Sequence, residues 1–208
     1  WKERLRGFVE RSSFPRRREA LAPHELDDRC QECVRVPESD HQRIKALGAA
    51  AGITANAFLQ TAWGFLLSRY SGCRDVVFGA VTSGRPAEVP GIESMVGLFV
   101  NTVPVRIVFD TRRSFMQIAK EVQAQAIAAS AYGQCSLAQI QSCAAVKGEL
   151  FDHILGFQNQ PFFNRYAETA EQPSAREGYE AVDLDSMGIT SYQLDVSFVP
   201  DREITTYI

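Results

Sequence analysis

The chain has 208 residues, of which 45% are hydrophobic and 23% are charged, and its formal net charge at pH 7 is -3. This composition predicts a folded domain with one sizeable core rather than a disordered chain. Nucleic acid is not an expected partner, because the arginine run at 16–18 beside a proline is typical of a solvated linker. No stretch reaches the roughly 18 apolar residues of a membrane helix and no export signal is present, so we expect a cytoplasmic protein without a membrane partner.

The five cysteines are an odd number and predict no disulfide framework, which favours a reducing compartment. Cys30 and Cys33 have the CxxC spacing of a zinc site. A structural zinc ion needs four ligands, and no second pair with suitable spacing follows in the sequence. We therefore expect no bound metal.

The first quarter of the chain predicts helices around one short strand. Residues 1–25 are expected to form a leading helix and a basic, proline-containing connector, and a strand is expected within 29–36. Ser39 and Gln42 have the spacing of a capping box, which would begin a helix that Gly52 ends.

Two further helices follow from capping signals and periodicity. Thr54 is the predicted N-cap of a helix that ends at Ser71 and Gly72, and Ser114 with Gln117 repeats the capping-box spacing before an alanine-rich helix. The apolar stripe expected to face the core in the first of these helices consists of Phe58, Ala62, Phe65 and Leu66.

Strands are expected between and after these helices. Apolar, β-branched runs that start at Val76 and at Val96 flank a loop rich in glycine and proline, and later candidates lie at 152–157, 191–199 and 203–208. Alternating helices and strands predict an α/β fold in which helices pack on a mixed β-sheet.

The run from 96 to 106 carries the most specific signal. It reads VGLFVNTVPVR and matches seven positions of the pattern (I/V)GxFVNTxxxR, a motif of the condensation domains of nonribosomal peptide synthetases, which this chain resembles. Residues 150–161 resemble the LFDxxLxFxNxP strand of the same family, with Gln158 where glutamate is usual. Residues 132–141 loosely resemble a short family segment with an aromatic residue or histidine at its start, and residues 191–200 resemble the strand that follows the family's variable crossover. The resemblance therefore extends along nearly the whole chain.

The resemblance implies a two-lobed protein with the chloramphenicol-acetyltransferase-like fold and an active site in a tunnel between the lobes. This chain would be the C-terminal lobe over residues 1–208, with residues 161–188 as a mobile latch that crosses to the other lobe. The family's catalytic HHxxxDG motif, which lies in the N-terminal lobe, is absent from the sequence. We therefore expect a fragment of a transferase that is inactive alone and contains no catalytic residue of its own.

The implied reaction is peptide-bond formation between aminoacyl or peptidyl thioesters. The substrates would arrive on the phosphopantetheine arms of donor and acceptor carrier proteins, so no cofactor would be bound directly. The N-terminal lobe, both carrier proteins and an adjacent adenylation domain are the implied partners. Such a reaction needs a positioned amine, help with proton transfer and stabilisation of an oxyanion.

The candidate residues for the tunnel lining or the lobe interface are Ser83, Gly84, Arg85, Asn101, Thr102, His153 and Gln158. Arg85 could reach the other lobe or a carboxylate from the tunnel floor, or could close a turn through a salt bridge. Asn101 and Thr102 need hydrogen bonds, either within the sheet or to a pantetheine amide. For His153 a structural or tunnel-lining role is favoured over catalysis, because its neighbour Asp152 would point to the opposite face of a strand.

Two other functions stay open. An epimerisation or heterocyclisation domain is a sibling enzyme, although epimerisation domains usually have a Gly-Trp-Phe-Thr core where residues 97–102 read GLFVNT. The alternative from another class is a non-catalytic docking lobe that recruits carrier or tailoring proteins.

Overall fold

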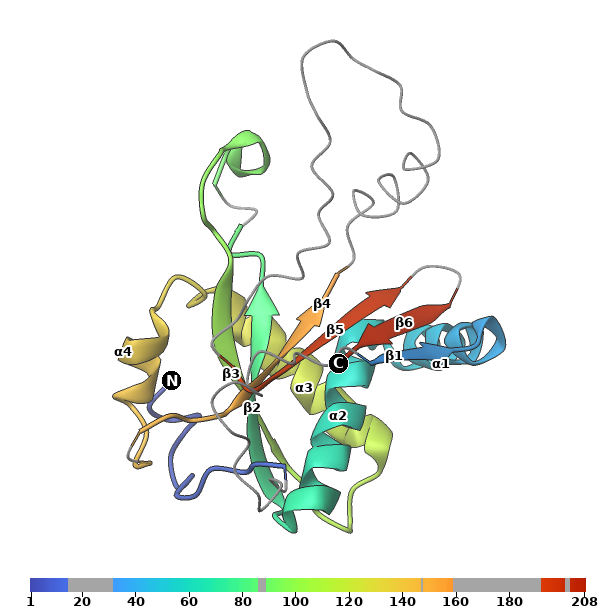
Figure 1. Ribbon diagram of the computed structural model, residues 1–208, viewed down its shortest axis with the longest axis horizontal. Coiled ribbons are helices and arrows are strands. Elements are labelled where there is room, and N and C mark those ends of the chain that lie inside the picture. The colour runs from blue at the N-terminus through green and yellow to red at the C-terminus, as the bar shows by residue number, and fades with distance from the viewer. Residues whose placement is uncertain (15–31, 86–88, 147, 159–191, 201–202) are drawn as a thin grey trace, which may run out of the picture.

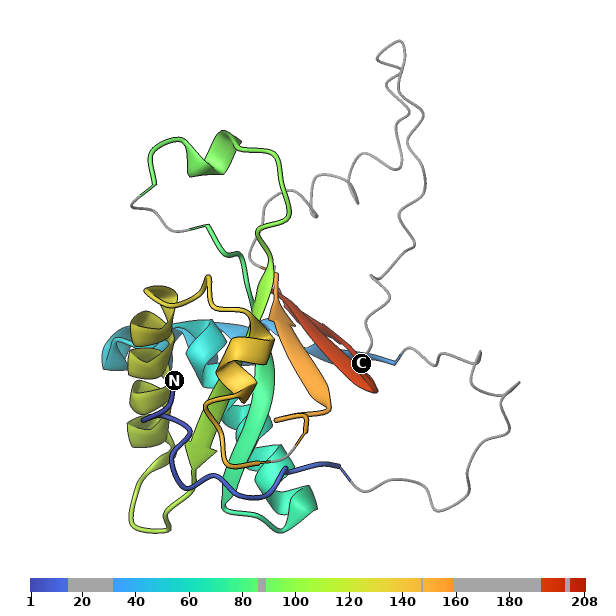
Figure 2. The same cartoon turned by 90° about the vertical axis from the view of Figure 1, so that its left-hand side faces the viewer.

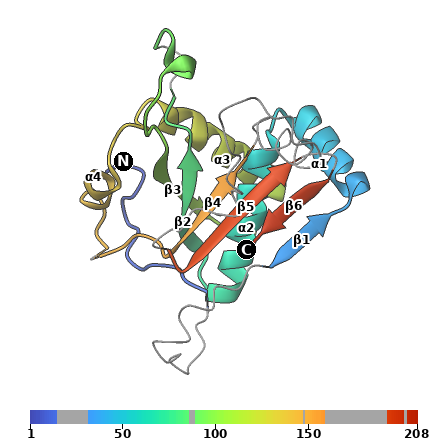
Figure 3. The ribbon, with the colours of Figure 1, turned by 45° about the horizontal axis from the view of Figure 1, so that its top comes forward.

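The computed structural model describes residues 1–14, 32–85, 89–146, 148–158, 192–200 and 203–208. These residues form a six-stranded sheet in the order β1-β6-β5-β4-β2-β3, with helices packed against it (Figures 1 and 3). The elements are β1 (Cys33–Val36), α1 (Glu38–Ala51), α2 (Ala55–Ser71), β2 (Asp75–Thr82), β3 (Asn101–Val108), α3 (Phe115–Ser130), α4 (Leu137–Gln141), β4 (His153–Phe157), β5 (Leu194–Pro200) and β6 (Ile204–Tyr207). Strand β4 pairs in parallel with β2 and β5, whereas the other pairs are antiparallel. The predicted α/β fold with helices on a mixed sheet is confirmed.

Most predicted helix ends are confirmed by their capping geometry. Gly52 and Gly72 end α1 and α2 with φ values of 68° and 73°, in the left-handed region that glycine adopts at little cost. The Thr54 hydroxyl accepts a hydrogen bond from the backbone of the first turn of α2, and Ser114 with Gln117 forms the predicted capping box of α3.

The predicted capping box at Ser39 is wrong. Helix α1 begins two residues earlier than this cap predicts, at Glu38, and its N-cap is Pro37. The Pro37 carbonyl already accepts hydrogen bonds from the backbones of Asp40 and His41. The first turn is therefore closed by the backbone, and Ser39 lies inside it.

The predicted leading helix is also wrong within residues 1–14. Residues 2–7 form turns and the rest of this segment has no regular secondary structure. The segment buries Leu5 and Phe8 in the smaller core cluster, together with residues of β2, β3, α4 and β4. Residues 15–25 and the expected latch at 161–188 lie outside the described residues.

The core-facing side of α2 differs from the predicted stripe, because Phe65 and Leu66 are 51% and 41% exposed. The helix instead packs through a face that includes Gly64, where an added Cβ would lie 2.7 Å from the Ile107 side chain. Because a small residue allows this close approach of α2 to β3, the large aromatic ring of Phe65 turns outward and packs edge-on against Phe109.

The second predicted strand starts later than expected. Strand β3 begins at Asn101, and the residues before it belong to an excursion between β2 and β3, residues 83–100, whose described parts project beyond the sheet (Figure 2). Strand β2 ends at Thr82, and Gly84 follows with a φ of 60°. In the part of the chain that the structure describes, the residues from Val96 to Val100 therefore pair with no neighbouring strand.

Candidate functional site

Five of the seven candidate residues lie together where the excursion joins the sheet. In the β2–β3 register Thr82 pairs with Asn101 and Val81 with Thr102, while Ser83, Gly84 and Arg85 continue directly from the end of β2. The sheet thus brings together two motifs that are about 18 residues apart in the sequence. His153 and Gln158 lie on β4 and immediately after it.

Arg85 organises the excursion. Its guanidinium donates hydrogen bonds to the backbone carbonyls of Ile92 and Met95, the latter at 3.1 Å, and lies 4.3 Å from the centre of the Phe99 ring. Gly84 is needed beside it, because an added Cβ would lie 1.7 Å from the Phe99 carbonyl oxygen. Within the described residues Arg85 closes the loop through carbonyls and an aromatic ring, not through the salt bridge considered above.

Asn101 connects the start of β3 to the loop between α3 and α4. Its Nδ2 donates to the carbonyls of Gly133 and Cys135 at 2.6 and 2.9 Å, and its Oδ1 accepts from the backbone N–H of Thr102 at 2.8 Å. The half-buried amide therefore uses both its donor and its acceptor in the lobe itself.

The motif arginine, Arg106, holds the N-terminal segment on the sheet. It forms a bidentate ion pair with Asp75 at 2.7 and 2.8 Å and donates to the carbonyls of Arg4 and Arg6. Bidentate arginine–carboxylate pairs fix geometry as well as adding energy. This position of the family motif therefore serves the packing of residues 1–14.

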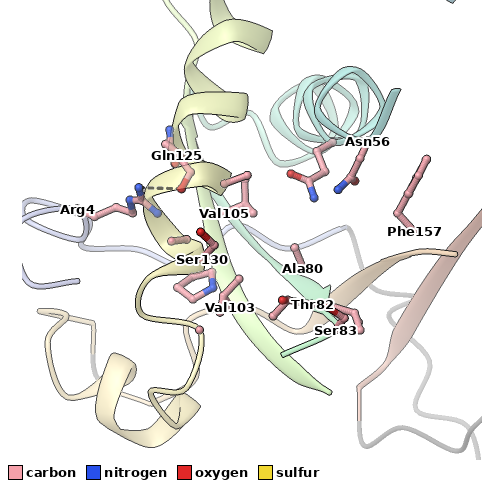
Figure 4. Close-up of a pocket in the computed structure, with 16 residues that line it drawn as sticks. Arg4, Asn56, Ala80, Thr82, Ser83, Val103, Val105, Gln125, Ser130 and Phe157 are labelled. Carbon is pink, nitrogen blue, oxygen red and sulfur yellow. Dashed lines mark hydrogen bonds between the residues drawn. The ribbon is translucent and has the colours of Figure 1, made fainter. Parts of the chain in front are cut away.

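A cavity of about 380 Å³ opens at the same end of the sheet, between α2, α3, β2 and β3 (Figure 4). Ser83 lines it, and Phe157, the residue before Gln158, lies at one side. The other lining residues are Arg4, Asn56, Gln60, Ala80, Val81, Thr82, Val103, Pro104, Val105, Gln125, Ala126, Ala129, Ser130 and Gly133. The wall thus combines apolar side chains with amide and hydroxyl groups and the Arg4 guanidinium.

Three amide side chains of this cavity were not among the predicted site residues. Asn56 and Gln60 come from α2 and Gln125 from α3. The sequence feature that indicates such a site is Gln60, a polar residue among the small and apolar residues on the buried face of α2. Its side chain is only 6% exposed.

His153 is buried in the main core rather than at the cavity. Its ring contacts Phe14, Trp63 and Phe78, and its Nδ1 lies 2.9 Å from Asp152 Oδ1. The expectation that the two side chains point apart is wrong, because β4 begins at His153 and Asp152 precedes the regular strand.

Burial lowers the pKa of His153 below its ordinary value and outweighs the opposite effect of Asp152. Burial raises the pKa of Asp152, but hydrogen bonds from His153 and Ser13 outweigh it and leave this pKa below the ordinary value. The pair is therefore a neutral imidazole that donates a hydrogen bond to a carboxylate.

Gln158 immediately follows β4 and is half-buried. Its backbone N–H donates to the Phe198 carbonyl at 2.9 Å, which continues the pairing of β4 with β5 by one residue. No group of three metal-ligating side chains occurs among the described residues; Cys33 is exposed, and Cys30 lies outside them. In that same part of the chain, no helix has the length and apolar character required to cross a membrane.

Comparison with known proteins identifies relatives along the full length. The chain is 38% identical to bacitracin synthase 3 of Bacillus licheniformis over 207 residues, which are 98% of this chain and 3% of that protein. It is 33% identical to bacitracin synthase 1 of the same organism over 203 residues, which are 98% of this chain and 4% of that protein. The chain thus spans a small part of these curated relatives.

Solved structures share the fold. The crystal structure of the X-domain from teicoplanin biosynthesis has a TM-score of 0.66 at 20% identity and matches 100% of this chain and 47% of its own. The first condensation domain of the calcium-dependent antibiotic synthetase, in complex with a substrate analogue, has a TM-score of 0.63 at 15% identity and covers 86% of this chain and 38% of its own. A family model described as Condensation domain matches residues 1–208. The chain belongs to the condensation-domain family of the nonribosomal peptide synthetases.

Proposed function

We propose that this chain is the C-terminal lobe of a condensation domain that joins an amine on one carrier protein to the acyl thioester on another. The observation that carries the proposal is the position of the cavity and of Ser83, Gly84, Arg85, Asn101 and Thr102 at one end of β2 and β3. In this proposal that end of the sheet is one wall of the substrate tunnel. The match of the lobe to 47% of the X-domain chain supports this division into lobes.

The excursion is the proposed contact with the other lobe. Val96 is fully exposed, and Leu98 and Val100 are 94% and 59% exposed, on a loop that projects from the cavity end of the sheet (Figure 2). Several large apolar side chains on one projecting loop are typical of a protein–protein contact. Arg85 supports this loop from within.

The chemistry of the cavity supports a division of labour between lobes. Within the described residues its wall contains no histidine, aspartate or glutamate. Attack of an amine on a thioester requires removal of a proton from nitrogen and stabilisation of the developing oxyanion. The HHxxxDG motif of the N-terminal lobe would supply the acid–base group, and this lobe would position the pantetheine-borne substrates.

The remaining partners follow from the same proposal. Donor and acceptor carrier proteins would deliver substrates on phosphopantetheine, and an adenylation domain would neighbour the condensation domain in the assembled synthetase. The chain itself would bind no cofactor directly.

A docking lobe is the second candidate function. One structural neighbour is the complex of the X-domain and OxyB from teicoplanin biosynthesis, at 21% identity and a TM-score of 0.66. That structure shares the fold of this chain, and its domain is in complex with a second protein. A docking role predicts that the completed domain, which is this chain joined to its N-terminal lobe, binds a tailoring protein but forms no amide bond.

Association with the HHxxxDG-bearing lobe of the same condensation domain tests the proposed contact. Sedimentation of the two lobes together should give a 1:1 complex, and Leu98→Asp should weaken it at least about tenfold, since a buried charge without a partner costs more than 1.4 kcal/mol. The control is Val9→Asp, at a side chain 75% exposed on the N-terminal segment. Equal affinities for the two variants would refute the excursion as the contact.

A further inference from the structure

The cavity contains two amide groups whose oxygens have no hydrogen-bond partner in the described part of the chain. Gln60 Oε1 on α2 and Gln125 Oε1 on α3 are both buried. The Gln60 side chain as a whole is 94% buried and lines the cavity, and among the described residues it makes no side-chain hydrogen bond. Because buried polar groups in folded proteins are nearly always paired, such an amide points to a group that binds beside it.

The rest of the wall restricts the chemistry of that group. Ala80, Val103 and Val105 give apolar surface, and hydroxyl groups come from Thr82, Ser83 and Ser130. Arg4 is the only charged side chain in the wall among the described residues; its guanidinium donates to the Gln125 backbone carbonyl at 3.1 Å. A cationic ligand in this cavity would be repelled by Arg4, and among the described lining residues no carboxylate would offset that repulsion.

A carboxamide matches these requirements better than an ammonium or a hydrocarbon. Its N–H groups can donate to glutamine oxygens, and its oxygen can accept from glutamine N–H groups or from Arg4. A side-chain amide can also exchange its oxygen and nitrogen by rotation, so either end of Gln60 can face the ligand. A hydrocarbon would leave both glutamines unpaired, which is unfavourable in a buried site.

We propose that this cavity is a carboxamide-binding subsite that recognises a neutral amide of the acyl substrate and rejects cationic groups. The identification of the ligand as part of a carrier-bound substrate rests on the proposed function; the amide selectivity does not. Two sources share this chemistry, the secondary amides of a pantetheine arm and the primary amide of an asparagine- or glutamine-like side chain. The first source would make the cavity part of the arm tunnel, and the second would make it a pocket that selects the amino acid.

Titration of the ¹⁵N-labelled 208-residue chain with small probes separates these cases. Butyramide represents the primary amide, D-pantetheine the arm and n-butylammonium the cation, and fragments of this size bind weakly enough to follow by NMR. The side-chain NH₂ signals of Gln60 and Gln125 should shift with at least one amide probe, while that of Gln42, exposed on α1, should not. The amide probe should bind at least about fivefold more tightly than butylammonium, which is the effect of one well-formed hydrogen bond.

Substitutions connect the binding to the glutamines. Gln60→Leu keeps the size of the side chain and should weaken the favoured amide probe about fivefold or more, whereas Gln42→Leu should leave its affinity unchanged. Gln125→Leu is the second test if Gln60→Leu does not fold. Absence of shifts at both glutamines, equal binding of butylammonium, or full affinity of folded Gln60→Leu would overturn the proposal. Amide binding by the chain, together with no peptide-bond formation when the chain is joined to the HHxxxDG-bearing lobe, would contradict the proposed function and leave the amide selectivity standing.

Discussion

Replacing Asn101 by alanine tests whether this motif residue belongs to the scaffold of the lobe. The substitution removes the two hydrogen bonds that connect β3 to the Gly133 and Cys135 carbonyls. A neutral hydrogen bond contributes about 0.5–1.5 kcal/mol, and a buried carbonyl left unpaired adds a further penalty. Because the site is only half-buried, we expect a total loss of about 2 kcal/mol of unfolding free energy.

The measurement is urea unfolding followed by circular dichroism, with the midpoint shifted and the slope unchanged. Thermal unfolding should show a decrease of about 4–8 °C, because 1 kcal/mol corresponds to about 2–4 °C in a chain of this size. Asn56→Ala is the matched control: Asn56 lines the cavity from α2, and in the described part of the chain its side chain makes no hydrogen bond. This control should change stability by less than about 0.5 kcal/mol.

The opposite pattern would refute the scaffold role. If Asn101→Ala is as stable as Asn56→Ala while the completed domain loses peptide-bond formation, the Asn101 amide contacts substrate rather than the α3–α4 loop.

Three further substitutions test the close packing at Gly79, the clamp that Arg106 forms on residues 1–14, and the buried His153. Gly79→Ala puts a Cβ 2.5 Å from the Phe151 ring and should cost about 1–3 kcal/mol in urea unfolding; Gly133→Ala, whose nearest atom is 3.4 Å away, is the control, and equal losses would contradict the packing. Arg106→Leu should cost about 2–3 kcal/mol and speed native-state proteolysis within residues 1–14, so an unchanged cleavage rate would exclude the clamp. Since burial lowers the pKa of His153, the unfolded chain takes up the proton first, and stability should fall as the pH drops below about 6.5; His153→Gln should flatten that part of the profile, and an unchanged slope would assign it to another group.

Features set by local sequence could be predicted before the structure. The caps at Thr54 and Ser114 and the stops at Gly52 and Gly72 depend on residues within one turn of each helix end, and all four are present. Ser136 and Gln139 have the same capping-box spacing and form a second capping box at α4, although the expectations above include no helix there.

Features set by packing could not be predicted in this way. The outward position of Phe65 depends on the close approach of Gly64 to Ile107, a residue 43 positions away. The cavity likewise brings together Gln60 of α2 and Gln125 of α3. Helical periodicity places each residue on its own helix but does not show that the two helices meet at one cavity. Among the predicted site residues, the structure places Ser83 on this wall but His153 in the core, because the position of a strand in the sheet decides which side chains face which layer.

Dipeptide formation between two loaded carrier proteins tests whether this chain is one lobe of a condensation domain. The assay compares the 208-residue chain alone with the same chain joined to the HHxxxDG-bearing lobe, and detects the amide product by mass spectrometry. We expect no product above the uncatalysed background for the chain alone and turnover for the joined lobes. Turnover by the chain alone, or binding of a tailoring protein by joined lobes that form no amide bond, would contradict it.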